Sequence, residues 1–322
     1  MNRNVLFALL AAALFGAGTP FAKLLVGDIA PVLLAGLLYL GSGIGLTLIR
    51  LVRDRGWHAS GLTRAEWPWL LGAIFFGGVA GPVALMIGLM TTSGSSASLL
   101  LNLEAVLTAV IAWVVFKENA DKRIVLGMAL IVAGGLVLSW PGASSGASDL
   151  VGPMFIGLAC LCWAIDNNLT RKVSASDALF IAGSKGVVAG LANTLLALGL
   201  GAVLPGFRTT LATMGVGLLG YGVSLVLFVL ALRGLGTART GAYFSTAPFI
   251  GALVSLLVFG ESTGLQFWMA ALLMGSGVWL HLTERHAHEH EHGPHEYEHT
   301  HTHATVRHSH AHFPDIHHRH GH

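Results

Sequence analysis

An apolar stretch that covers residues 94–118 occurs a second time in this chain, 143 positions later. Read as a helix, each copy is long enough to cross a lipid bilayer, which takes about 20 apolar residues. The copies differ near their middle, where the first has Glu104 and the second has Ala247-Pro248. A repeated membrane helix with a different polar insert in each copy indicates a transporter that arose by duplication.

Composition agrees with a chain that is embedded in a membrane. Of its 322 residues, 54% are hydrophobic and only 11% are charged, whereas soluble domains have about 25% charged residues. The two cysteines, Cys160 and Cys162, lie in an apolar run and are expected to pack as small hydrophobic side chains. We therefore predict an all-α polytopic membrane protein, with the lipid bilayer as a partner and no nucleic acid.

Ten apolar segments are expected to form the transmembrane helices. They cover residues 4–26, 31–49, 67–90, 95–116, 124–140, 153–170, 178–204, 212–232, 238–259 and 265–282. Arg and Lys gather in alternate loops, and Arg208 is the exception on the opposite side. This positive-inside pattern predicts that both termini are cytoplasmic and that the protein lies in the cell (inner) membrane.

The first segment also resembles a secretory signal peptide, because a short basic start precedes an apolar run. Against that interpretation, the segment continues to Lys23, and its pattern recurs in the second half of the chain. We expect it to be retained as the first helix.

The repeat divides the chain into two five-helix units, residues 4–140 and 153–283, joined by a linker over 141–152. Five is an odd number, so the second unit must lie upside down relative to the first. Inverted repeats of this kind place a substrate site at their interface near the middle of the membrane. Residues 284–322 are rich in histidine and nearly free of aliphatic side chains, so we expect a disordered cytoplasmic tail.

Three motifs carry a resemblance to a known family. They are F-G-x-x-T-P-F-A-K in the first helix and the V-F-K-E and V-F-G-E ends of the fourth and ninth helices. On these motifs, residues 4–283 resemble the drug/metabolite transporter superfamily, and within it the ten-helix EamA-type transporters. The resemblance implies secondary transport of a small solute by alternating access, with export as the expected direction. The chain departs from the family at Tyr39, where many members carry Arg, and at Glu104, where many have an apolar residue before a Pro.

Glu104 is the first candidate for a role in transport. A charge at the centre of a membrane helix costs about 2.5–3.5 kcal/mol, so it usually faces a cavity, a partner or a transported ion. Such a carboxylate suits proton coupling or the binding of a cationic group, and a structural ion pair is the alternative. Lys185, well inside the seventh helix, is its candidate partner, although Asp166 is an alternative partner for Lys185 and snorkelling to the interface is another. Lys23 either snorkels or, as the resemblance implies, belongs to the pathway.

Uncharged residues complete the predicted substrate pathway. They are Tyr39, Asn102, Asn167, Asn168, Tyr221, Tyr243 and Pro248. Asn102 is turned about 200° away from Glu104 on an ideal helix, and Pro248 is expected to free the carbonyl of Phe244 within the ninth helix. An interfacial belt is the alternative for Tyr39 and Tyr221, and the tryptophans are given no function.

Closely spaced histidines in the tail suggest metal binding. The predicted ligands are His286, His288, His290, His292, His299, His301 and His303. Neutral imidazoles suit Zn²⁺, Ni²⁺, Co²⁺ or Cu²⁺, and a pH-responsive charge brush or a passive extension are the alternatives. Apart from such ions, no cofactor is required by the predicted function.

Secondary transport of a small-molecule solute is the function that the sequence favours. A divalent-metal transporter that uses the tail, and a membrane metal sensor that moves no solute, are the alternatives. We expect no enzyme activity, because the chain has no H-E-x-x-H motif and no Ser/His pair at membrane depth. No oligomeric state is predicted.

Overall fold

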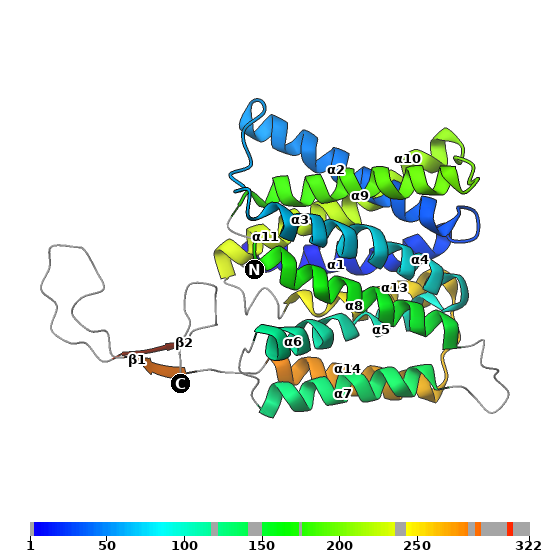
Figure 1. The fold of residues 1–322 in the computed structure, drawn as a ribbon. Helices are drawn as coiled ribbons and strands as arrows, with labels where there is room; N and C mark the ends of the chain where they lie inside the picture. The colour runs from blue at the N-terminus through cyan, green and yellow to red at the C-terminus, as the bar shows by residue number, and fades with distance from the viewer. Residues whose placement is uncertain are drawn as a thin grey trace, which may run out of the picture.

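The fold comes from a computed structural model, which describes residues 3–116, 122–140, 150–173, 176–235, 243–282, 287–290 and 308–311. Nearly all of this part of the chain is helical, as predicted. The helices are α1 (Arg3–Leu25), α2 (Pro31–Asp54), α3 (Trp67–Ala73), η1 (Ile74–Ala80), α4 (Gly81–Thr91), α5 (Gly94–Leu100), α6 (Leu103–Phe116), α7 (Lys122–Ser139), α8 (Val151–Arg171), α9 (Ala178–Gly199), α10 (Phe207–Gly217), η3 (Leu218–Val223), α11 (Ser224–Leu235), α13 (Ala247–Phe259) and α14 (Leu265–Leu282). They lie roughly side by side in one bundle (Figure 1).

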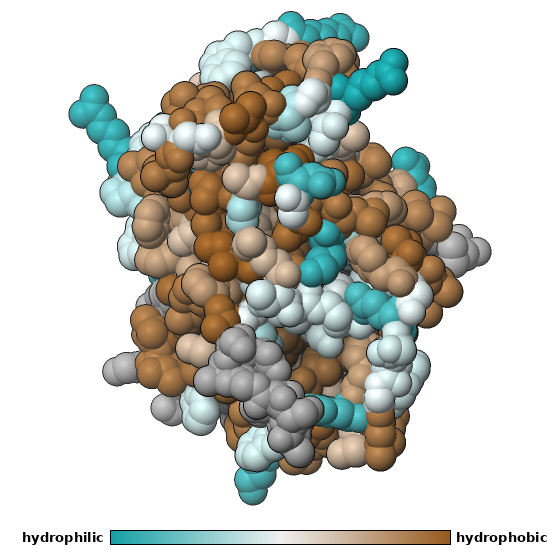
Figure 2. Space-filling model, turned by 90° about the vertical axis from the view of Figure 1, so that its right-hand side faces the viewer, coloured by the Kyte–Doolittle hydropathy of each residue, from teal (hydrophilic) through white to brown (hydrophobic). Residues whose placement is uncertain are grey.

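Six helical segments of the described chain are long and apolar enough to cross a membrane, and three shorter apolar helices accompany them. Helix α8 is not among these, although it has 21 residues, because Asp166, Asn167 and Asn168 lower its apolar character. The prediction of about ten spans therefore stays a prediction. Hydrophobic residues cover much of the surface, as expected for a protein in lipid (Figure 2).

Several predicted helix boundaries were wrong. Helix α2 continues five residues beyond the predicted end, to Asp54, because ion pairs hold its polar last turn. Helix α9 ends at Gly199 and α10 begins at Phe207, since the chain between them contains Gly201 and Pro205. Helix α13 begins only at Ala247, with Pro248 in its first turn, where a missing N–H costs nothing.

Two membrane-spanning segments contain a π-helical turn. The segment over 67–91 is made of α3, the π-helix η1 and α4, and the segment over 207–235 is made of α10, the π-helix η3 and α11. The two π-helices occupy equivalent positions of the internal repeat, about 143 residues apart. The fourth segment is interrupted instead, because a turn at Leu101 and Asn102 separates α5 from α6. Helix α13 starts at the equivalent point of the second repeat.

Glycines bring repeat-related helices into backbone contact. A Cβ added to Gly43 of α2 would lie 2.2 Å from the backbone nitrogen of Val187 on α9, and one added to Gly36 would lie 2.7 Å from that of Thr194. In the other direction, a Cβ added to Gly190 of α9 would meet the backbone of Leu40. The contact partner on α9 moves backward as the residue on α2 moves forward, so the two helices run antiparallel. Helices α7 and α14 form a second such pair at the lower edge of Figure 1. Antiparallel pairing of equivalent helices is the geometry that inverted repeats require.

The predicted linker and tail fall mostly beyond what the structure describes. Residues 141–149 of the linker lie outside the described residues. In the tail, two short strands, β1 (Ala287–His290) and β2 (His308–Ala311), pair antiparallel with Ala287 opposite Ala311 and His290 opposite His308. Disorder was expected for the whole tail, but these eight residues form strands. In both strands histidine alternates with other residues, which matches the two-residue period of a strand.

An ion-pair cluster fixes α2 against α9 at the end of the bundle where α2 ends, which we term the Arg50 end. The side chain of Arg50 is only 4% exposed and donates to Asp177 at 2.9 Å, while Arg53 donates to Asp177 at 2.6 Å. Arg50 also donates to the His58 carbonyl at 2.8 Å and lies against the rings of Trp57 and Phe180. The cluster thus anchors the chain beyond α2 and the start of α9.

The pKa of Asp177 reflects this anchoring. Burial alone would raise it, but hydrogen bonds from Arg53, Arg50 and the Leu179 N–H outweigh burial and lower the pKa from 3.8 to about 2. A carboxyl whose folded-state pKa is lowered stabilises the fold above its ordinary pKa. That stabilisation is lost as the pH falls from about 4 toward 2.

We therefore predict that Asp177→Asn destabilises the protein at neutral pH by about 2 kcal/mol. Asparagine keeps the helix cap to Leu179, so the change isolates the charge. In thermal unfolding of the detergent-solubilised protein, the gap between wild type and variant should shrink below about pH 4. A gap that stays constant over that range would contradict the ion-pair explanation.

Candidate functional site

Three consecutive polar residues of α8 reach three different partners in the middle of the bundle. Asp166 bonds to Lys185 of α9, Asn167 bonds to Glu104 of α6, and Asn168 donates to the carbonyls of Ala164 and Thr108. Helix α8 therefore connects the predicted charged residues into one polar cluster. Asp166 and Asn168 are buried, whereas Asn167 is exposed.

Lys185 is paired with Asp166. Its Nζ lies 2.5 and 2.7 Å from the two carboxylate oxygens and 3.3 Å from the hydroxyl of Thr170, which itself donates to Asp166 at 2.8 Å. The lysine and aspartate side chains are 17% and 10% exposed. Two carboxylates were possible partners of Lys185, and in the structure Asp166 is the partner. The predicted pairing with Glu104 was therefore wrong. Helical periodicity gives the face of a residue but not its neighbour on the next helix.

Glu104 lies in the first turn of α6, just after the break at Leu101 and Asn102. Its Oε1 accepts a hydrogen bond of 2.8 Å from Asn167, which also lies 3.3 Å from the hydroxyl of Thr108. The positive end of the helix dipole favours a carboxylate at this position. Within the described residues, no salt bridge joins Glu104 to a basic side chain.

The exposed side chain of Asn167 faces the inside of the bundle. On α8, lipid-facing residues such as Met154 and Leu158, 70% and 47% exposed, form one stripe. At about 100° per residue, Asn167 lies roughly opposite that stripe. On α6, Glu104 is half-buried and lies beside Asn167 through their hydrogen bond. An exposed asparagine on the inner face of a membrane helix indicates an interior space that water can reach.

Two backbone carbonyls of the π-helix η1 accept hydrogen bonds from side chains of other helices. A widened turn releases carbonyls from the regular pattern of a helix. The Gly77 carbonyl accepts from the Tyr39 hydroxyl at 2.7 Å and from the Trp163 ring nitrogen at 3.0 Å, and the Gly78 carbonyl accepts from Asn193 at 2.9 Å. These bonds connect η1 with α2, α8 and α9. Gly77 also makes room for Asp166, because an added Cβ would lie 1.9 Å from Oδ2.

Trp163 and Asn193 were not among the predicted site residues. Trp163 was treated as a packing residue because its ring is largely apolar, and Asn193 is an isolated amide in an apolar helix. The available signal was the pair Gly77-Gly78, which marks a place where other groups approach the backbone closely.

Aromatic side chains continue from the polar cluster toward α1. The rings of Tyr39 and Tyr221 lie 5.7 Å apart, and Phe15 lies 6.0 Å from Tyr221 and 5.3 Å from Phe244. Tyr221 belongs to η3 and is the repeat equivalent of Gly78. Tyr39 bonds to the Gly77 carbonyl, and Asp166 packs against Gly77. The two predicted tyrosines thus lie together at the edge of the cluster.

The remaining predicted residues lie elsewhere. Lys23 donates to the Leu89 carbonyl at the other end of the bundle, where Glu261 is its charged neighbour. Asn102 is buried at the break before α6 and donates to the Leu99 carbonyl at 2.8 Å.

Tyr243 and Pro248 lie just before and within the start of α13. The Tyr243 carbonyl accepts from the Thr246 hydroxyl at 2.6 Å. We expected Pro248 to free a carbonyl inside a continuous helix. This expectation was wrong, because α13 begins at Ala247. Asn102 and Pro248 therefore mark the two interruptions rather than the polar cluster.

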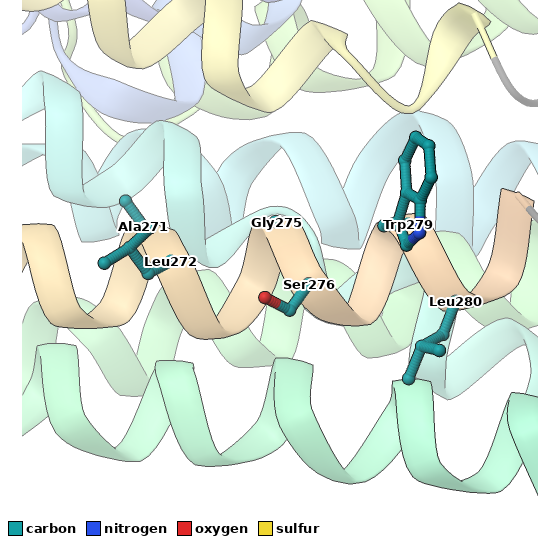
Figure 3. A pocket seen from close by; sticks show the side chains of 6 residues that line it. All are labelled: Ala271, Leu272, Gly275, Ser276, Trp279 and Leu280. Atoms are coloured by element: carbon teal, nitrogen blue, oxygen red, sulfur yellow. The ribbon is translucent and has the colours of Figure 1, made fainter.

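Two surface hollows lie outside the cluster. One, of about 410 Å³, runs along α14 (Figure 3) and is lined by Ala271, Leu272, Gly275, Ser276, Trp279 and Leu280. Leu272 and Trp279 are 72% and 65% exposed, which suits a groove that faces lipid. The other, of about 290 Å³, lies at the Arg50 end among Arg50, Asp54, His58, Ala59 and Asp177.

The predicted metal ligands cannot be placed as a site. His286, His292, His299, His301 and His303 lie outside the described residues, and only the backbone of His288 and His290 is described, within β1. In the described part of the chain, no three His, Cys, Asp or Glu side chains form a group that could hold a metal ion.

We predict that Lys185→Met destabilises the protein by about 3–5 kcal/mol, because it leaves Asp166 buried without its counter-charge. The double variant Lys185→Met/Asp166→Asn should recover much of this loss, since no uncompensated charge remains. Thermal unfolding of the purified protein in detergent measures both effects. Equal destabilisation by the single and double variants would argue against a buried ion pair.

Comparison with known proteins gives a consistent result. The model of the EamA-like transporter family matches residues 2–140 and again residues 150–283. The chain is 26% identical over 281 residues to an uncharacterized transporter of Methanothermobacter thermautotrophicus, covering 83% of this chain and 82% of that one. It is also 29% identical over 174 residues to the uncharacterized transporter YyaM of Bacillus subtilis, covering 52% and 56% of the two chains.

A solved structure described only as the crystal structure of a protein is similar in fold. The TM-score is 0.65 at 18% identity, with 86% of this chain and 94% of that chain covered. At this identity the likeness concerns the fold alone.

Proposed function

This chain belongs to the EamA-like transporter family, and we propose on that premise that it moves a small solute across the membrane by alternating access. It is thus a multi-pass membrane protein of a transporter family. We propose export as the direction and expect no catalytic activity. We further place it in the cell (inner) membrane with both termini, and hence the Arg50 end, in the cytoplasm, because Lys and Arg gather in the loops on that side.

The observation that carries this proposal is the exposed Asn167 on the inner face of α8, which bonds to the half-buried Glu104 of α6. Glu104 lies directly after the interruption between α5 and α6, and α13 begins at the equivalent interruption of the second repeat. Interrupted helices near the membrane midplane are typical of substrate sites in inverted-repeat transporters. A packed anchor bundle would have no reason to keep an exposed amide beside a carboxylate there.

The opposite end of the bundle, which we term the Glu261 end, is closely packed. An added Cβ at Gly94 of α5 would lie 2.6 Å from the Ser255 hydroxyl of α13, and one at Gly251 would lie 2.8 Å from the hydroxyl of Ser98. The Glu261 carboxylate accepts from the backbone N–H groups of Gly94 and Ser95 at 2.9 and 3.1 Å. These contacts support a conformation that is closed at the Glu261 end, with Glu104 reached from the Arg50 end.

This proposal makes a prediction that needs no known substrate. In a variant with Cys160→Ala and Cys162→Ala, Asn167→Cys should react with a membrane-impermeant maleimide added on the Arg50 side of oriented vesicles. The reaction from the Glu261 side should be much slower. Glu261→Gln should accelerate it, because the charge and one of the two acceptor oxygens for Gly94 and Ser95 are lost.

Met154→Cys on the lipid face of α8 is the matched control and should stay unreactive from both sides. A dry interior, with Asn167→Cys unreactive from either side under native conditions, would rule out the proposed path.

A second candidate function concerns the tail, whose dense histidines suit divalent metal ions. If the cargo is such an ion, or if the protein senses it, the tail should be needed for metal handling. We predict that deletion of residues 284–322 leaves the labelling of Asn167→Cys unchanged. Metal tolerance of cells that express the deletion should fall if the tail serves a metal function. Unchanged tolerance to Zn²⁺, Ni²⁺, Co²⁺ and Cu²⁺ would remove this candidate.

A further inference from the structure

We propose that the site at Glu104 selects solutes that carry a positive charge, with organic amines as the chemical class. This inference rests on the transport function proposed above and adds the substrate class. It follows from which hydrogen-bonding groups of the polar cluster are already used and which are left for a ligand.

Lys185 has no capacity left for an anionic ligand. A lysine ammonium has three N–H donors, and Lys185 makes three contacts: two with the oxygens of Asp166 and one with Thr170. Its charge is balanced by Asp166 at 2.5 Å. An anion would therefore have to break this buried pair to find a cation in the cluster.

Glu104, in contrast, has capacity left. A carboxylate offers about four acceptor positions, and in the described part of the chain Glu104 receives one side-chain hydrogen bond, from Asn167 at 2.8 Å. The amide nitrogen of Asn167 must point at Glu104, because the carboxylate only accepts. The amide oxygen of Asn167, a further acceptor, is therefore turned away from Glu104. The groups that remain for a ligand are acceptors, and an ammonium group supplies donors.

The net charge points the same way. Asp166 and Lys185 cancel, so an ionised Glu104 leaves the cluster with one negative charge in a region where a charge without a partner is costly. A cationic ligand would neutralise it, whereas an anion would double the cost. The rings of Tyr39 and Tyr221, 5.7 Å apart, lie at the edge of the cluster, and aromatic rings attract ammonium groups.

Three probes of nearly equal size separate charge from shape: benzylammonium, benzyl alcohol and benzoate. Binding to the purified full-length protein is measured from the rise in its thermal unfolding midpoint with probe concentration, and a series of smaller alkylammonium ions extends the test. We expect benzylammonium to bind at least about tenfold more tightly than the other two.

Glu104→Gln should weaken amine binding by about tenfold or more, because one charge-assisted hydrogen bond is lost. Glu104→Asp keeps the charge and should retain the preference for the amine, which guards against a simple folding defect. Glu66→Gln is the matched control, since Glu66 lies outside the bundle core and bonds to Thr63. It should bind amines like the wild type.

Equal or tighter binding of benzoate or benzyl alcohol would overturn the inference, as would amine binding that Glu104→Gln leaves intact. Absence of binding by every amine of the series would overturn it too. A failure of the transport proposal would be recognised separately, because in that case Asn167→Cys would not react with the maleimide. If labelling succeeds and amine selectivity fails, the path is right and the substrate class is wrong.

Discussion

Within a membrane, each backbone carbonyl that leaves the regular helix pattern needs a donor from elsewhere. The π-helix η1 meets this requirement with donors from three other helices: Tyr39 and Trp163 reach Gly77, and Asn193 reaches Gly78. Because Trp163 is on α8, the bond also sets the rotation of α8 about its axis. That rotation directs Asp166 to α9 and Asn167, one residue later, to α6. The positions of the charged residues thus follow from how two glycine carbonyls are satisfied.

Duplication supplies the scaffold, and divergence between the copies supplies the site. Equivalent helices still contact each other through glycines, as α2 and α9 do at Gly43 and Gly186, and both repeats retain a π-helix. The polar residues, however, differ between the copies. Glu104 is matched by Ala247 in the second repeat, and Gly78 is matched by Tyr221. The first repeat therefore contributes Glu104, whereas the second contributes Asn167 and the ion pair of Asp166 and Lys185.

Much of this arrangement could be predicted from the sequence, and the limits have physical causes. Apolar segments and the repeat placed Glu104, Asp166 and Lys185 at membrane depth, because hydropathy and spacing depend only on the chain itself. The partner of Lys185 could not be chosen, since that depends on how far α8 is rotated against α9. The π-helices were missed because one extra residue in a turn hardly changes an apolar pattern. Pro248 was assigned to the interior of a helix because the interruption before α13 leaves hydropathy unchanged.

The unequal packing of the two ends bears on how such a protein would cycle. At the Glu261 end, α5 and α13 meet closely through glycine and serine, with the ring of Phe259 also beside Gly94. The two hydrogen bonds from Gly94 and Ser95 to Glu261 are made to a helix N-terminus, where the helix dipole favours a carboxylate. Opening this end would replace those bonds with bonds to water, a net change of only about 0.5–3 kcal/mol per bond. A closure of this size suits a gate that must open repeatedly, whereas the buried pair of Asp166 and Lys185 suits a fixed part of the site.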